Sequence, residues 1–330
     1  MNWFEGPPET VYERLRAAVE QSMWEITATL RYKTSLQQAV EYVLKLPGKR
    51  MRPLLCLLSS ALEGGSPWRA VPAAAAVEIL HTFTLVHDDI MDRSPLRRGQ
   101  PTVHVRWGDA IAILTGDVLV GLAYRFIERY ADHPRYYWIL HTMTAGLLEV
   151  SEGQALDLEL PQVERPTLEH YWQMVDGKTT ALFRCTLLIG ACVGELTPQT
   201  QHLVEELAIP LGRAFQLQDD LLDLIGRSDE TGKQQGQDLY EGKLTYAVIR
   251  ALELLPGHQL LEQYRQARGV PTSALPQLVR LFRELGLLQE MEQWIEHYYA
   301  SAFAVIEQLP AAPARELLRG LVEQLRYRRR

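Results

Sequence analysis

Residues 71–92 read VPAAAAVEILHTFTLVHDDIMD. Up to Val86 the stretch is apolar on almost every side of a helix, which is typical of a helix buried in a protein core. It ends in Asp88, Asp89 and Asp92, and the first and last share one helical face because they are four residues apart. Carboxylates crowded at the end of a buried helix repel one another and lose hydration unless a cation lies between them. The stretch therefore predicts a core helix whose end binds a cation.

A second aspartate motif repeats this arrangement further along the chain. Residues 215–223 read FQLQDDLLD, and Asp219, Asp220 and Asp223 have the same spacing as the first trio. One such motif alone would favour a solvated helix surface, whereas two beside apolar residues favour a common site. Mg²⁺ prefers carboxylate oxygens and completes its octahedron with water and substrate phosphates. We therefore expect two facing carboxylate sets that hold Mg²⁺ around a diphosphate.

The rest of the chain also has the pattern of helices. Apolar residues recur at helical period in nearly every long segment, and no segment has a convincing strand alternation. Glycine and proline clusters lie where the helices should end. The expected helices cover residues 11–30, 35–46, 51–62, 69–91, 109–130, 136–156, 168–193, 200–224, 244–255, 273–285, 288–308 and 315–327. Because no spacer is long or polar enough to separate domains, we expect a single all-α domain over residues 1–330.

Composition and charge limit the classes of function. The chain has 330 residues, 47% hydrophobic and 23% charged, which is ordinary for a soluble globular protein. A net charge of −7 argues against nucleic acid as a partner. Glu78 and Asp117 interrupt the most apolar windows, so no membrane span is expected. Three cysteines without paired spacing, and no signal peptide, favour a reduced, cytoplasmic setting.

Basic residues lie beside both aspartate motifs or in turns. Arginine suits fork-like contacts with phosphate, and lysine acts as a mobile point charge. Any one of these residues alone would favour a surface charge, but their grouping predicts a phosphate site in an acidic protein. They are Lys49, Arg50 and Arg52 in GKRMRP, Arg97 and Arg98 after the first motif, Lys178 in KTT, Lys233 in the glycine-rich segment 226–242, and Lys243 after it.

Together these motifs resemble the trans-isoprenyl diphosphate synthase (polyprenyl synthetase) family. The matching segments are GKRMRP at 48–53, HTFTLVHDDIMD at 81–92, LRRG at 96–99, GD at 116–117, EGQ at 152–154 with Asp157, KT at 178–179, FQLQDDLLD at 215–223, GK at 232–233, Asp238 and Lys243. In order and spacing they span more than half of the chain. The resemblance implies a large helical bundle of the isoprenoid synthase type with a central active-site cavity. It also implies a homodimer and three Mg²⁺ ions per active site.

The resemblance further implies a role for each matching residue. The Mg²⁺ ligands would be Asp88, Asp92 and Asp219, while Asp89, Asp220 and Asp223 would support them or bind the metal through water. The allylic diphosphate would be bound by Arg97, Lys178, Lys233 and Lys243, and isopentenyl diphosphate by Lys49, Arg52, His81 and Arg98. Thr179 and Gln216 would lie beside the allylic carbon where positive charge develops, and Phe215 beside the isopentenyl chain. Gln154 and Asp157 would lie near the metal–diphosphate cluster.

The implied reaction is a head-to-tail condensation of isopentenyl diphosphate with an allylic diphosphate. Mg²⁺ and cationic side chains stabilise the departing diphosphate, so the allylic C–O bond ionises. The double bond of isopentenyl diphosphate then attacks the allylic cation, a proton is lost, and a linear all-trans prenyl diphosphate results. A class I terpene cyclase and a non-catalytic partner subunit are less favoured alternatives, because both aspartate motifs and the basic 48–53 segment are intact.

Phe83 and Thr84 bear on product length. The resemblance implies that bulky residues just upstream of the first aspartate motif form the floor of the pocket for the growing chain. A large residue followed by a small one is similar to the geranylgeranyl type, which favours a twenty-carbon product. A farnesyl or longer polyprenyl product remains an alternative, as does a floor set by a neighbouring helix.

Overall fold

The computed structural model describes residues 3–226, 235–269 and 274–328. Helices dominate these ranges, and the strands within them form one antiparallel hairpin of β1 (Leu96–Arg97) and β2 (Gln100–Pro101). The all-α class predicted from the sequence is confirmed. The longer helices are α1 (Pro8–Ile26), α2 (Ser35–Lys45), α3 (Met51–Ser60), α4 (Val71–Met91), α6 (Asp109–Ile127), α7 (Tyr136–Glu159), α8 (Leu168–Val175), α9 (Ala181–Val193), α10 (Pro198–Ile225), α13 (Tyr246–Leu254), α14 (Gln259–Ala267), α15 (Leu275–Glu284), α16 (Leu287–Ile306) and α17 (Pro313–Arg326). The shorter ones are η1 (Thr27–Thr29), η2 (Pro67–Ala70), α5 (Val103–Trp107), η3 (Glu128–Tyr130), η4 (Leu160–Gln162), η5 (Asp176–Thr180) and α12 (Gln237–Tyr240).

The chain divides into two compact units, each built from separate segments. Unit 1 comprises Met1–Leu147, Arg184–Glu206 and Ile306–Glu323. Unit 2 comprises Leu148–Phe183, Leu207–Val305 and Gln324–Arg330. The first aspartate motif belongs to unit 1 and the second to unit 2. The single domain expected over residues 1–330 stays a prediction.

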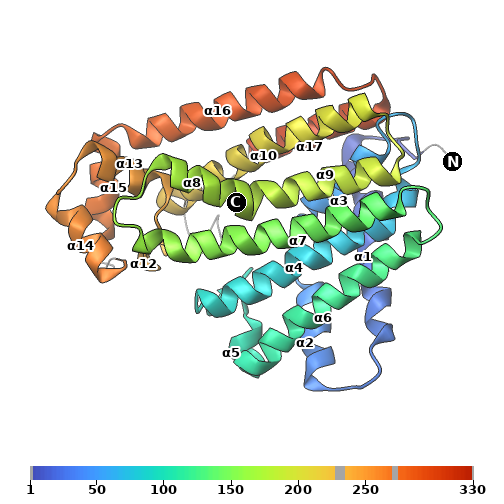
Figure 1. Ribbon diagram of the computed structural model, residues 1–330, viewed down its shortest axis with the longest axis horizontal. Coiled ribbons are helices and arrows are strands. Elements are labelled where there is room, and N and C mark those ends of the chain that lie inside the picture. The colour runs from blue at the N-terminus through green and yellow to red at the C-terminus, as the bar shows by residue number, and fades with distance from the viewer. Residues whose placement is uncertain (1–2, 227–234, 270–273, 329–330) are drawn as a thin grey trace. The chain divides into compact units, whose positions relative to one another are not determined.

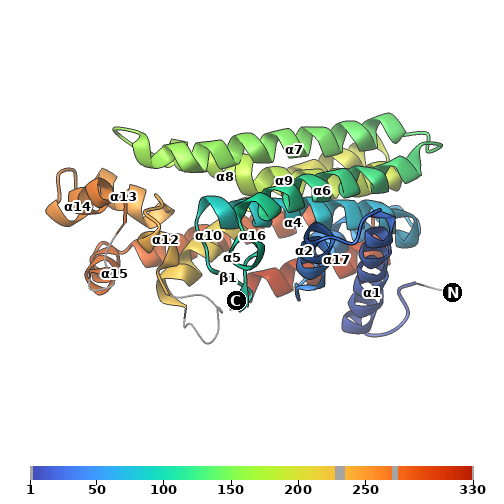
Figure 2. The ribbon, with the colours of Figure 1, turned by 90° about the horizontal axis from the view of Figure 1, so that it is seen from below.

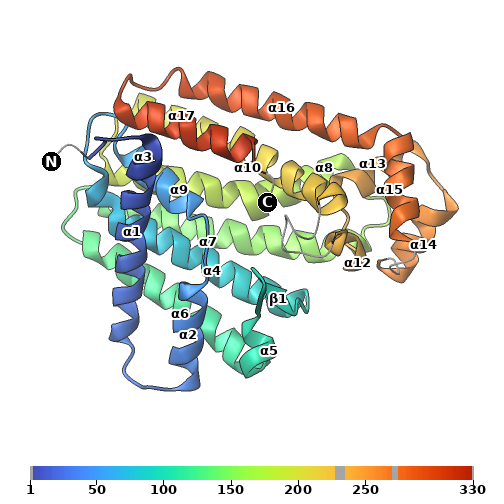
Figure 3. The same cartoon turned by 180° about the vertical axis from the view of Figure 1, so that it is seen from behind.

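Helix α4 packs against α1, α3 and α6 within unit 1 (Figures 1 and 3). The four alanines at positions 73–76 are fully buried, and their short side chains let the neighbouring helices approach at the density of a protein core. Pro72 stands in the first turn, where a proline sacrifices no helical hydrogen bond. The helix predicted over residues 69–91 is thus observed, and its last turn carries the first aspartate motif.

Two described helical stretches are long and apolar enough to cross a membrane, by length and composition alone. They are Pro67–Met91, with 61% of its most apolar window buried, and Asp109–Tyr130, with 44% buried. Core helices of soluble proteins have the same composition, and the first stretch contains α4. In the second, the outer face of α6 leaves Ile113 and Leu114 exposed by 48% and 47%. An apolar helix face of this kind is typical of a contact surface.

Unit 2 contains the segments that carry the second motif. Helix α8 packs against α13, and α13, α14 and α15 lie together (Figure 2). Helix α8 begins with a capping box, in which the Thr167 hydroxyl accepts from the N–H of His170 and the ring of His170 accepts from the N–H of Thr167. The rings of Tyr171 and Tyr246 meet edge to face with centroids 5.7 Å apart and are almost completely buried.

The structure departs from the sequence prediction at one long helix and at several short elements, which include α12 and η4. The sequence predicts one helix over residues 168–193, whereas α8 and α9 are separated by η5, a π-helical turn. Helices α5 and α14 are not predicted, because they are short and bury few side chains: Val103 in one, Leu261 and Tyr264 in the other. The β1–β2 hairpin is also not predicted, since each strand has only two residues.

Candidate functional site

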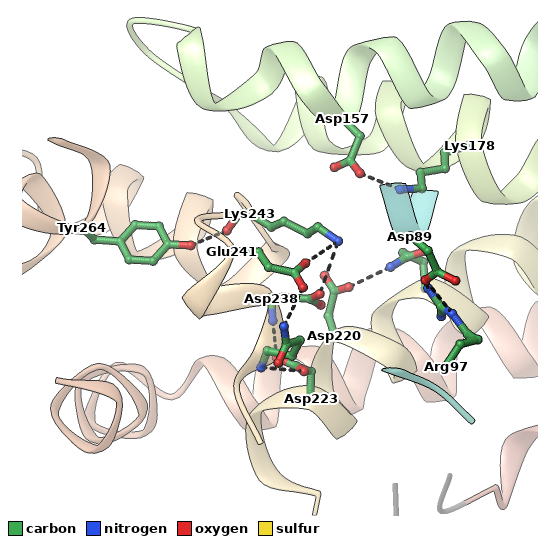
Figure 4. A network of polar contacts seen from close by, with 12 residues as sticks. Asp89, Arg97, Asp157, Lys178, Asp220, Asp223, Asp238, Glu241, Lys243 and Tyr264 are labelled. Atoms are coloured by element: carbon green, nitrogen blue, oxygen red, sulfur yellow. Dashed lines mark hydrogen bonds and ion pairs between the residues drawn. The ribbon is translucent and has the colours of Figure 1, made fainter. Parts of the chain in front are cut away.

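The first aspartate motif occupies the last turn of α4 and the residue that follows it. Asp89 is 5% exposed, and its Oδ1 accepts from Nε of Arg97 at 3.0 Å and from Nη2 at 2.6 Å (Figure 4). Burial raises the pKa of the Asp89 carboxyl, and the Arg97 guanidinium partly offsets this shift. Asp88 and Asp92 are half-buried and share the neighbouring helix face. The motif is thus divided into one carboxylate held by an arginine and two that reach the surface.

A basic cluster lies in the same unit. Nη1 of Arg52 lies 3.3 Å from Nε2 of His81. Because a guanidinium only donates, Nε2 accepts and the neutral ring carries its proton on Nδ1. Burial lowers the pKa of His81 well below its usual value, and the charges of Arg52, Arg98, Arg97 and Arg50 lower it further. Among the described atoms this buried Nδ1 has no hydrogen-bond partner, so it can donate to a ligand oxygen.

Arg50 has a different role from the one that its place in GKRMRP suggests. Its side chain is only 3% exposed and faces inward. It donates to Glu20 Oε1 at 3.1 Å, to Glu78 Oε1 at 2.8 Å, and to the carbonyls of Leu44 and Leu46 at 3.2 and 3.1 Å. Its backbone is left-handed, with φ of +50°. Arg50 therefore fixes the chain at the start of α3, between Lys49 and Arg52.

Gly48 lets the hairpin approach this loop. A Cβ at this position would lie 2.8 Å from Nη1 of Arg98, which itself donates to the carbonyl of Leu46 at 3.4 Å. Arg98 and Gly99 both have positive φ, so the hairpin turns tightly at this point. The predicted residues Arg52, His81 and Arg98 are thereby gathered within unit 1.

In the second motif the three aspartates also have different surroundings. Asp220 is 2% exposed and accepts from the hydroxyl of Tyr171 at 2.9 Å, from Nε2 of Gln216 at 2.9 Å and from the N–H of Tyr246 at 3.2 Å. Burial, with a contribution from Asp238, raises its pKa to about 7. Asp223 accepts the N–H groups of residues 237 and 238, at the start of α12. Asp220 and Asp223 are thus both fixed by several hydrogen bonds.

Asp219 is the most exposed aspartate of this motif, with its side chain 47% exposed. Its Oδ1 lies 2.5 Å from Nη2 of Arg328. Arg328 also covers the ring of Phe215, with its guanidinium carbon 3.7 Å from the ring centroid, and donates to the Phe215 carbonyl at 2.7 Å. The sequence shows a basic C-terminus but gives no sign that Arg328 pairs with Asp219, because the two are separated by more than a hundred residues.

Lys178 lies in the π-helical turn η5, where two backbones are in contact. A Cβ on Gly153 of α7 would lie 2.1 Å from the backbone nitrogen of Lys178, and a Cβ on Gly177 would lie 2.9 Å from the Cα of Gly153. This close approach brings Nζ of Lys178 to 2.6 Å from Oδ2 of Asp157 (Figure 4). Gln154, which follows Gly153, is buried. Among the described atoms neither its amide nitrogen nor its amide oxygen has a hydrogen-bond partner. The amide nitrogen and oxygen of Gln154 can therefore still form hydrogen bonds.

Thr179 begins a directed chain of hydrogen bonds. Its hydroxyl donates to Oε1 of Gln216 at 2.7 Å, and Gln216 in turn donates to Asp220. The hydroxyl hydrogen is therefore committed, and the Thr179 oxygen can present a lone pair to positive charge. Thr179 and Gln216, which the resemblance places beside the allylic carbon, are hydrogen-bonded to each other, and their position relative to that carbon stays a prediction.

The remaining predicted residues are placed as follows. Nζ of Lys243 lies 2.9 Å from Glu241 and 3.7 Å from Asp238 (Figure 4). The backbone carbonyl of Lys243 accepts a hydrogen bond from the Tyr264 hydroxyl. The ring of Phe83 meets that of His87 edge to face at 4.9 Å, and the Thr84 hydroxyl donates to the carbonyl of residue 81. Lys233 lies outside the described residues.

The donor set fits a hard divalent cation. Within the described ranges no group of three or more His, Cys, Asp or Glu side chains is arranged to hold a metal ion by itself. The motif members that are not fully buried, Asp88, Asp92, Asp219 and Asp223, offer carboxylate oxygens as ligands. Mg²⁺ is usually bound by one or two carboxylates together with substrate phosphates and water, so the set suits Mg²⁺ better than zinc.

Known proteins are similar to this chain over most of its length. A family model described as polyprenyl synthetase matches residues 33–281. A short chain isoprenyl diphosphate synthase of Methanocaldococcus jannaschii is 41% identical over 67% of this chain and 67% of its own. A geranylgeranyl diphosphate synthase of Saccharolobus solfataricus is 42% identical over 66% of this chain and 67% of its own. A crystal structure of a geranylgeranyl pyrophosphate synthase matches with a TM-score of 0.88 and 34% identity, covering 96% of this chain and 98% of the other.

Proposed function

Because this chain belongs to the polyprenyl synthetase family, we propose that it extends an allylic diphosphate with isopentenyl diphosphate and releases a linear all-trans prenyl diphosphate. The observation that carries the proposal is the contrast within each aspartate motif. In both motifs a buried aspartate is held by protein donors, while neighbouring carboxylates reach the surface beside cationic side chains. An acidic chain can bind a diphosphate in this way only if cations join the exposed carboxylates to it.

Ionisation of the allylic diphosphate is the step that this arrangement supports. Asp88, Asp92 and Asp219 would hold Mg²⁺, three ions in each site, with Asp89, Asp220 and Asp223 keeping the motifs in place. The bound metal supplies charge that stabilises the departing diphosphate. Arg97, Lys178, Lys233 and Lys243 would contact the same diphosphate. Nζ of Lys178 lies 2.6 Å from Oδ2 of Asp157, and this ion pair orients the ammonium group.

Isopentenyl diphosphate would bind in the basic cluster of unit 1. Its diphosphate would accept from Lys49, Arg52 and Arg98, and from the Nδ1–H of His81. A neutral histidine among arginines suits this task because it donates a hydrogen bond without adding a further buried charge. The Thr179 oxygen and the Gln216 amide would face the allylic cation, and Phe215 the isopentenyl chain.

A twenty-carbon product is the proposed outcome, with a farnesyl or longer product as the alternative. The names of the relatives at 41% and 42% identity agree with a short chain, although they describe those proteins and not this one. Phe83 lies on α4 five residues before Asp88, where a bulky ring can end the pocket.

The protein is further proposed to be a cytoplasmic homodimer without an integral membrane segment. The apolar outer face of α6, with Ile113 and Leu114 about half exposed, would be covered by the second copy. Sedimentation at micromolar concentration tests this, and a monomer there would contradict it.

Incubation of the purified protein with dimethylallyl diphosphate, isopentenyl diphosphate and Mg²⁺ tests the proposed activity. A linear prenyl diphosphate is expected. A cyclic hydrocarbon would instead indicate a cyclase, and no product would indicate a non-catalytic subunit.

A further inference from the structure

The π-helical turn η5 has an anchor that is not part of the aspartate motifs. Asp176, its first residue, accepts from Nε of Arg213 at 3.0 Å through Oδ1 and from Nη2 at 2.6 Å through Oδ2. Two parallel N–H bonds to one carboxylate define both distance and orientation, which a single contact does not. The Thr180 hydroxyl, at the other end of the turn, also donates to Oδ1 of Asp176 at 3.3 Å.

Arg213 is itself held from two sides. Its guanidinium carbon lies 5.0 Å from the ring centroid of Trp172, on α8, and 5.9 Å from that of Tyr298, on α16. Nη1 also approaches the Tyr298 hydroxyl at 3.4 Å. Cation–π contacts of this kind restrict the guanidinium plane, so the pair with Asp176 is more rigid than an ordinary surface ion pair.

Three contacts align η5 with one face of α10. Arg213 meets Asp176, Gly212 lies against Thr180, where a Cβ would come within 2.3 Å of the hydroxyl oxygen, and Gln216 accepts from Thr179. Position 216 follows positions 212 and 213 by four and three residues, so its side chain lies on the same side of α10 as each of them. The turn therefore cannot slide along α10 while these contacts are intact.

We propose that Asp176 and Arg213 are a positioning pair that holds η5 in register with α10, so that Lys178 and Thr179 point at the allylic diphosphate. Neither residue touches substrate. The inference rests on the proposed prenyltransferase activity, because it assigns the pair a purpose within that reaction. π-Helical turns are rare and are frequently found at functional sites, and here the contacts with α10 fix the turn that carries the two side chains.

The test uses Arg213→Gln, Asp176→Asn and their combination in the full-length enzyme. Each single variant should lower kcat by about 10- to 100-fold, as expected when a reacting group is displaced by a fraction of an ångström to an ångström, with the KM for isopentenyl diphosphate changed less than about twofold. The double variant should be no slower than the slower single variant, because both break one interaction. Arg213→Lys keeps the positive charge but loses the two parallel N–H donors, so it should have intermediate activity.

Arg69→Gln is the matched control, since it removes an arginine–carboxylate pair at 3.0 Å to Glu195 in unit 1. It should leave kcat unchanged. Circular dichroism and thermal unfolding identify any variant that fails to fold, and Arg213→Lys then provides the comparison. Calorimetry with Mg²⁺ and inorganic diphosphate gives a readout independent of turnover, and Arg213→Gln should weaken this binding.

The outcomes separate the two claims. Equal kcat in wild type and in both single variants would overturn the positioning pair while leaving the proposed activity intact. A similar loss of kcat in Arg69→Gln, or additive losses in the double variant, would overturn it as well. A wild type that makes no prenyl diphosphate would overturn the proposed activity, and the calorimetric comparison would then decide whether the pair still organises a diphosphate site.

Discussion

Gly153→Ala should strongly lower kcat although it replaces no charged residue. The new methyl group would lie 2.1 Å from the Lys178 nitrogen and 2.2 Å from the Gly177 carbonyl carbon, both backbone atoms that cannot rotate away. To regain ordinary van der Waals contact, α7 and η5 must move apart by about 1.3 Å. A displacement of about 1 Å at a reacting group costs roughly 100-fold in rate, so kcat should fall by about that factor. Overpacking should also lower the free energy of unfolding by about 1–3 kcal/mol.

Gly146→Ala is the control for this prediction. It makes the same substitution two turns earlier in α7, and its Cβ would lie 2.6 Å from Cβ and Sγ of Cys185, away from η5. The expected loss of stability is therefore similar, whereas kcat should stay within about twofold of wild type. The assay is steady-state turnover of both diphosphates, with thermal unfolding in parallel. Equal turnover in the two variants, at equal stability, would refute the argument that the α7–η5 contact positions Lys178.

Four further predictions concern single side chains. Asp88→Ala should lower kcat by orders of magnitude while the helical circular dichroism spectrum is kept, and a chelator should abolish wild-type activity until Mg²⁺ is restored; near-normal turnover would remove Asp88 from the ligand set. Arg98→Ala should chiefly raise the KM for isopentenyl diphosphate and Lys178→Ala that for the allylic substrate, a division that equal shifts in both KM values would contradict. The pKa of His81 is lowered in the folded state, so below pH about 6.5 this residue is protonated in the unfolded chain but stays neutral in the folded chain. As the pH falls below that value, the free energy of unfolding should therefore decrease by up to about 1.4 kcal/mol per pH unit. His81→Gln should remove that part of the pH dependence in denaturant titrations, and an unchanged slope would show that His81 is not the group responsible. Phe83→Ala should open the pocket and lengthen the products resolved by chromatography, whereas an unchanged distribution would place the floor elsewhere.

The sequence alone was sufficient for most of the longer helices and for the position of the first aspartate motif at the end of one of them. Period and spacing are local properties, so the apolar run before Asp88 predicts α4 whatever packs against it. The same holds for the shared face of Asp88 and Asp92, because a helix places residues four apart on one side. The helical class is confirmed for the same reason. Short elements such as α14 escaped prediction, since two buried side chains are too few to define a period.

Only the tertiary structure decided which side chains of each motif are buried and which residues they contact. Within GKRMRP, three cations are equivalent in sequence, yet Arg50 turns inward to Glu20 and Glu78 while Arg52 meets His81. Within the aspartate trios, the distant residues Arg97 and Tyr171 determine which carboxylate is buried and held. The π-helical turn likewise depends on contacts with glycines and with Arg213 on other helices. Contacts of this kind join residues far apart in the chain, so no local pattern records them, and only the packed fold brings the partners within hydrogen-bonding distance.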